Sequence, residues 1–288
     1  MDSRRERWGV TQWAAYFEHQ ALPVMRRSKE LMAQQESVEG EMLSPKGLAE
    51  IAMQDPLLCL SLLQAAERRK SHRLDHETTT ALAATLQLGV DEFRKMLLAS
   101  PEVDERNEGL LRVEMRAHLA AQLALTWSTG RGDLNPDEVA VAALLGGIGD
   151  LLLWIYEPEI PQRAEEALRS GRATRSAQAQ FQTCGFTFKD LTLQCAMRWK
   201  LPSLLMLLLR GSESIRARMS RSCANAARHV LDTSESADMA LASDLVEVIR
   251  LVPNASIEWL AAGLTMLSEA RRERVVRLAF AQTASLSI

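Results

Sequence analysis

The sequence predicts an all-α protein of about a dozen helices, and three observations carry that prediction. The chain of 288 residues is rich in Leu, Ala, Met, Glu, Gln and Arg and poor in Tyr and Phe, a composition typical of helices. Apolar residues recur at helical spacing along most of the chain. No segment alternates polar with apolar residues, and no Asn-Gly or Asp-Gly dipeptide indicates a hairpin.

Short capping motifs predict where the first helices begin. Ser44-Pro45 and Asp55-Pro56 each place a capping side chain before a proline at the first helical position. Proline fits there because its missing N–H has no partner in that turn. We expect helices over about residues 8–35 (interrupted at Pro23), 45–52, 56–66, 78–88 (ended by Gly89), 91–100 and 110–128.

The middle of the chain holds its most apolar run, Ala143–Leu153, which the helix starting at Asn135-Pro136 is expected to enter. This run carries Gly146, Gly147 and Gly149, and each glycine costs a helix interior about 1 kcal/mol relative to alanine. Either a close helix crossing or the loss of functional side chains accounts for them. Later helices are expected over about 161–170, 175–182, 187–199, 202–209, 213–231, 236–251 and 256–282, with Thr187 to Asp190 as a capping box.

Several of these landmarks together resemble the HDOD (HD-related output domain) family. They are a helix followed by Asp55-Pro56, a leucine-rich helix ending in Gln64-Ala65-Ala66, and a helix ending in Leu88-Gly89. An alanine-rich helix then carries His118, and Trp199–Pro202 resembles the family's Trp-x-Leu-Pro tetrad. The resemblance covers roughly residues 22–210 and implies a multi-helix HD-like bundle.

The resemblance also implies which positions would hold metal. The wider HD superfamily hydrolyses phosphate esters with metal ions held by histidines and by an adjacent His-Asp pair. Gly146 and Gly147 stand where that pair would be, and glycine offers no ligand atom. The family's later histidines, near Phe188 and Arg210, are also missing. We therefore predict no catalytic residue, no metal and no cofactor, and a residual pocket of His118, Gly146, Gly147 and Asp150.

Two alternatives remain for the members of this pocket. Asp150 follows Gly146 by about one helical turn and is either a replacement ligand or an ordinary capping acid. His118 is either a remnant of the ligand set or a hydrogen-bonded core histidine. Restoring the His-Asp pair at Gly146 and Gly147 is expected to overpack the helix crossing and destabilise the fold.

Basic clusters are the other candidate sites. One cluster follows the leucine-rich helix and consists of Arg68, Arg69 and Arg73. These side chains either bind a phosphate or lie in solvent at the end of the helix. Further clusters lie at residues 216–221 and 271–274. The second of these belongs to a helix that either docks on the core or offers a groove to a partner.

Composition limits the partners. Hydrophobic residues at 47%, charged residues at 25% and a net charge of −3 are ordinary values for a globular protein, so nucleic acid is not an expected partner. The N-terminal segment has no apolar signal region, and no apolar run is expected to reach the roughly 18 residues that span a bilayer. We expect a cytoplasmic protein that does not engage membranes. The sequence is compatible with a homo-oligomer. Residues 1–211 are expected to form the HDOD-like domain and 212–288 a helical extension packed on or next to it.

Three functions are compatible with the sequence. The first is a non-catalytic signalling or regulatory module that binds a protein partner, which the sequence does not identify. The second is a sensor in which the emptied pocket binds a nucleotide, such as a cyclic dinucleotide, through His118 and nearby arginines. The third is a surviving metal-dependent phosphohydrolase.

Overall fold

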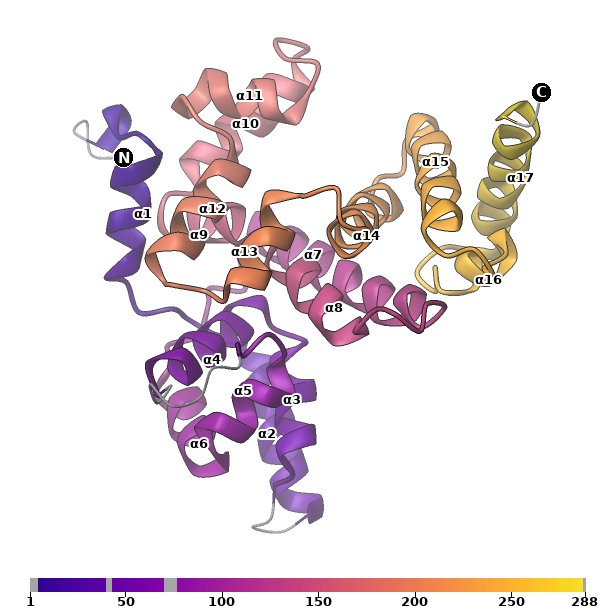
Figure 1. Cartoon of the computed structure of the whole chain (residues 1–288). Coiled ribbons are helices and arrows are strands. Elements are labelled where there is room, and N and C mark those ends of the chain that lie inside the picture. The colour runs from indigo at the N-terminus through magenta and orange to yellow at the C-terminus, as the bar shows by residue number, and fades with distance from the viewer. Residues whose placement is uncertain (1–4, 40–42, 70–76, 287–288) are drawn as a thin grey trace. The chain divides into compact units, whose positions relative to one another are not determined.

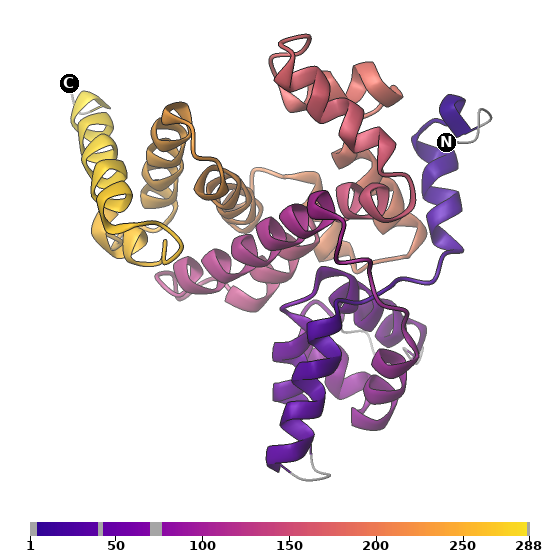
Figure 2. The same ribbon diagram turned by 180° about the vertical axis from the view of Figure 1, so that it is seen from behind.

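Helices account for 74% of the residues that the structure describes. The structure, a computed structural model, describes residues 5–39, 43–69 and 77–286, in which we find seventeen α-helices and no strand beyond one isolated bridge (Figures 1 and 2). The all-α prediction is confirmed. The helices are α1 (Val10–Glu18), α2 (Arg26–Glu39), α3 (Pro45–Ala52), α4 (Pro56–Arg69), α5 (Ala81–Leu88), α6 (Val90–Ala99), α7 (Glu108–Ser128), α8 (Pro136–Leu145), α9 (Ile148–Tyr156), α10 (Glu159–Arg169), α11 (Ser176–Cys184), α12 (Phe188–Arg198), α13 (Ser203–Arg210), α14 (Ile215–Leu231), α15 (Glu235–Leu251), α16 (Ile257–Ala262) and α17 (Glu269–Leu286).

The chain forms two compact units. Unit 1 comprises residues 1–115 and 145–206, and unit 2 comprises residues 116–144 and 207–288. The boundary at 206/207 lies close to the expected one at 211/212, but residues 116–144 also group with the C-terminal helices. The independence of residues 212–288 stays a prediction.

Unit 1 contains a bundle of α2 to α6, which gather together in both views (Figures 1 and 2). Two of its helices, α3 and α4, begin at the predicted caps. Ser44 Oγ accepts the Gly47 N–H at 3.0 Å, and Asp55 Oδ1 accepts the Leu57 and Leu58 N–H groups at 3.0 and 3.1 Å. These bonds satisfy amide groups that the first turn of a helix leaves without partners.

A second group in unit 1 consists of α1 and α9 to α12, with α12 packed between α1 and α9. The predicted capping box at the start of α12 is confirmed, because Thr187 Oγ1 accepts the Asp190 N–H and the Asp190 carboxylate accepts the Thr187 N–H. The main chain bridges Val24 to the segment after α6, with Val24 donating to Pro101 O at 2.8 Å and accepting from Val103 N at 3.0 Å.

The expectation of one helix over 256–282 is wrong. The structure instead has α16 and α17, separated by residues 263–268. The break is stabilised at the indole of Trp127, which is fully buried and donates to Leu260 O at 3.1 Å. Arg272 donates to the carbonyls of Leu264 and Leu267 in the same segment. Such side chain to backbone bonds replace the helical ladder that the interruption removes.

In the described part of the chain, one stretch, Pro136–Tyr156, is long and apolar enough to cross a membrane by length and composition alone. The expectation that no apolar run reaches that length was therefore wrong. A buried core segment of a soluble protein passes the same test, and 72% of this stretch's apolar window is buried. Its two helices, α8 and α9, are also separated at Gly146 and Gly147.

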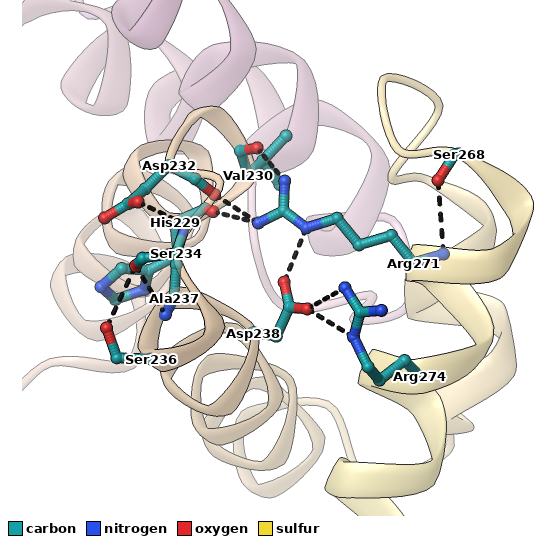
Figure 3. A network of polar contacts seen from close by, with 10 residues as sticks. All are labelled: His229, Val230, Asp232, Ser234, Ser236, Ala237, Asp238, Ser268, Arg271 and Arg274. Carbon is teal, nitrogen blue, oxygen red and sulfur yellow. Dashed lines mark hydrogen bonds and ion pairs between the residues drawn. The ribbon is translucent and has the colours of Figure 1, made fainter.

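In unit 2, α15 lies between α14 and α17 in both views (Figures 1 and 2). Asp238 on α15 is 3% exposed and binds two guanidinium groups of α17, those of Arg271 at 2.6 Å and Arg274 at 2.7 Å (Figure 3). Arg271 also donates to the carbonyls of His229 and Val230 at the C-terminal end of α14, at 2.9 and 2.8 Å. Arg271 therefore links all three helices, and the basic cluster at 271–274 docks on the core.

We expect Asp238→Asn to lower the stability of unit 2 by about 3 kcal/mol at pH 7, because it leaves two guanidinium groups without their shared carboxylate. Burial opposes ionisation of Asp238, but Arg271 and Arg274 outweigh it and hold the pKa below its ordinary value of 3.8. A lowered folded pKa gives stability that is present above pH 3.8 and is lost as the pH falls through the folded value.

Urea unfolding from pH 7 to pH 3 measures this difference. The difference in the free energy of unfolding between wild type and Asp238→Asn should become smaller below about pH 4. The exposed Asp91→Asn is the control and should unfold like wild type. If this difference in unfolding free energy does not depend on pH, the stabilising role of the ionised Asp238 carboxylate is contradicted.

Candidate functional site

The predicted residual pocket draws its residues from both units. Gly146, Gly147 and Asp150 belong to unit 1, and His118 lies half-buried on α7 in unit 2. α8 enters the apolar run as expected but ends at Leu145, so no continuous helix places Asp150 one turn after Gly146. Gly147 is the N-cap of α9, and Asp150 lies in the first turn of that new helix. A carboxylate there interacts favourably with the positive end of the helix dipole.

Gly147 is not the crowded glycine of this stretch. A Cβ atom at Gly147 would meet only Val113 Cγ1, at 4.0 Å, and Gly146 is exposed. The crowding expected at a helix crossing is therefore not found at Gly147. The close approach occurs at Gly149, where a Cβ atom would lie 2.5 Å from Phe188 O and 2.8 Å from Thr192 N.

Thr192 completes this contact between α9 and α12. It is 3% exposed, accepts the Gly149 N–H at 3.0 Å and donates to Phe188 O at 3.0 Å. The hydroxyl therefore gives a partner to a first-turn amide of α9. Sequence reasoning missed Thr192, because only the bare backbone of Gly149 brings the two helices this close.

A buried acidic cluster lies elsewhere in unit 1. The Asp55 carboxylate is fully buried and accepts four hydrogen bonds, from Met25 N at 2.7 Å, Ser28 Oγ at 2.8 Å and the two amide groups at the start of α4. Burial raises the pKa of Asp55, and these hydrogen bonds oppose that rise. With both oxygens used by the fold, Asp55 acts as a structural group.

Glu114 on α7 is the second buried acid, 3% exposed. Arg27 donates to both of its carboxylate oxygens, and also to Gln54 O at 2.6 Å. Burial raises the pKa of Glu114, although the Arg27 guanidinium acts in the opposite direction. Sequence reasoning missed this pair, because its members are 87 residues apart.

The predicted phosphate contacts separate into different environments. Arg69 donates to Leu88 O at 2.7 Å and lies 3.3 Å from the Glu92 carboxylate, so it fastens α4 to the start of α6. Arg68 instead lines an open pocket of about 410 Å³. Arg73 lies outside the described residues.

The cluster at 216–221 is also engaged within the chain. Arg216 lies 3.7 Å from the Glu138 carboxylate, Arg218 pairs with Glu247, and Arg221 donates to Gly211 O at 3.3 Å. Within residues 5–39, 43–69 and 77–286, no three His, Cys, Asp or Glu side chains come together as a group that could hold a metal ion.

With this geometry established, the comparisons identify the family. The profile of the HDOD domain matches residues 27–215, and the chain belongs to the HDOD family. Among curated proteins, no sequence match was found.

Solved structures share the fold. The MmoQ response regulator of Methylococcus capsulatus is 20% identical with a TM-score of 0.63, over 86% of this chain and 99% of its own. A virulence factor of Campylobacter jejuni is 15% identical with a TM-score of 0.70, over 92% of this chain and 96% of its own.

We expect Gly149→Ala to destabilise the protein by about 1–3 kcal/mol, because the added methyl group meets backbone atoms that cannot move aside without separating α9 from α12. Gly147→Ala is the matched control, since its Cβ has room, and it should change stability by less than about 0.5 kcal/mol. Chemical denaturation of both variants measures the difference. Equal destabilisation would contradict this account of the glycines.

Proposed function

We propose that this chain is a non-catalytic HDOD regulatory module that acts in the cytoplasm by binding another protein. One observation carries the proposal: the chain has an exposed turn, Gly146-Gly147, where the superfamily resemblance places a metal-binding His-Asp pair. A turn without side chains supplies neither imidazole nor carboxylate ligands for an ion.

The environment of the remaining acids supports the same proposal. Phosphoester hydrolysis on a metal centre needs carboxylates and imidazoles that are free to coordinate. Asp55 is saturated by four donors and Glu114 is held by Arg27, so the two most buried acids of unit 1 stabilise the bundle instead.

The surface of α5 supports a role in protein binding. Leu82 and Leu86 lie one turn apart on this helix and are 39% and 63% exposed. Neighbouring exposed leucines on one helix face are a typical anchor for a partner.

The first test is metal content and catalysis. Elemental analysis of purified protein and phosphodiesterase assays with manganese, iron or magnesium, on cyclic dinucleotides and on a chromogenic diester, should find less than stoichiometric metal and no turnover. Gly146→His with Gly147→Asp should still fold, because both positions have room. Stoichiometric metal with turnover that His118→Ala abolishes would refute the proposal.

The second test is the partner surface. Quantitative capture from the native cell with wild-type bait should recover a protein that the Leu82→Glu, Leu86→Glu double variant loses. Phe181→Glu on α11 removes a comparably exposed apolar side chain, 62% exposed, and should retain the protein. If all three baits recover the protein equally, α5 is not the binding surface.

A further inference from the structure

A pocket in unit 1 contains an arginine without an ion pair and a buried amide N–H group without an acceptor, both judged among the described residues. It lies between α4, the segment after α1, the end of α6 and the residue that caps α12, and its volume is about 410 Å³. Small-molecule sites typically occupy about 300–1,000 Å³. The lining residues that matter here are Leu22, Gln64, Arg68, Met96, Pro101 and Trp199.

Gln64 and Arg68 lie one turn apart on α4 and form the polar side of the pocket. Gln64 is 8% exposed, and its Oε1 accepts a long hydrogen bond of 3.3 Å from Arg68 Nη2. The Gln64 Nε2 group is buried and has no hydrogen-bond partner among the residues that the structure describes. A buried N–H group without an acceptor is unfavourable, so an acceptor that enters this pocket gains a bond the free protein lacks.

Arg68 has no ion-pair partner within the described part of the chain. The adjacent Arg69 shows the contrast, because it is held by Leu88 O and Glu92. The guanidinium of Arg68 is exposed and can present two parallel N–H donors to a phosphate or a carboxylate.

The pocket also has apolar and aromatic lining residues. Trp199, Pro101 and Leu22 line it, and an indole offers a flat surface to a ring. The acid among the lining residues, Glu18, is neutralised by Arg198 at 2.9 Å, so it does not oppose the entry of an anion.

We propose that this pocket binds a small organic anion, with its phosphate or carboxylate on Arg68 and Gln64 and its ring against Trp199. The proposal goes beyond the protein-binding function and does not depend on it. It also concerns a different site from the glycine turn, since none of the predicted pocket residues His118, Gly146, Gly147 and Asp150 lines this cavity.

Titration calorimetry on the full chain tests the proposal with five probes. GMP and AMP carry a ring and a phosphate, indole-3-acetate carries a ring and a carboxylate, guanosine lacks the anion, and inorganic phosphate lacks the ring. At least one ring-bearing anion should bind with a Kd below about 1 mM, and guanosine and phosphate should bind more weakly. The preferred anion distinguishes a phosphate ligand from a carboxylate ligand.

Arg68→Ala should weaken that binding by about tenfold or more, because a charge-assisted hydrogen bond is lost. Arg69→Ala removes the same charge one residue away and should stay within about threefold of wild type. If the ligand ring lies against Trp199, binding should change the tryptophan fluorescence of the wild-type protein. This change should be smaller in Trp199→Phe. No binding by any ring-bearing anion, or equal loss in the Arg68 and Arg69 variants, would overturn the proposal.

Discussion

The buried carboxylate of Asp55 is the constraint on which the bundle of α2 to α6 depends. One oxygen caps α4 and the other holds Met25 N and Ser28 Oγ at the start of α2, so a single side chain fixes two helix origins against each other. An ionised group in an apolar interior is costly unless hydrogen bonds replace its water, and four donors do so here. The neighbouring Arg27 extends the same junction to α7 through Glu114.

Local signals were sufficient to predict where α3, α4 and α12 begin. The Ser44, Asp55 and Thr187 caps act within three residues of themselves, and a sequence displays both members of each interaction together. The division of 256–282 into α16 and α17 depends on Trp127, which lies 133 residues from its partner Leu260. Contacts of that kind are decided by tertiary packing, which no local pattern records.

The glycine stretch illustrates the same limit at the candidate site. The sequence correctly indicated that helix propensity did not select these residues, but it could not say which glycine met which neighbour. The structure separates them into a turn with open space at Gly147 and a close contact at Gly149. The position that the resemblance aligns with a metal ligand, Gly147, and the position that holds α9 against α12, Gly149, are therefore different residues, two positions apart. A substitution series across the stretch must treat them separately.

The arginines of a basic cluster on a helix must likewise be sorted by the side of the helix on which each lies, before the cluster is given a role. Successive residues of an α-helix point about 100° apart, so Arg68 and Arg69 leave α4 in different directions, one into the pocket and one to Leu88 and Glu92. Arg271 and Arg274, three residues apart, share a face and meet the same carboxylate of Asp238. The intervening Arg272 instead donates to carbonyls of the preceding segment. Charge density along the sequence predicts a patch, but helical geometry decides which cation remains available to a ligand, and among these arginines it leaves Arg68.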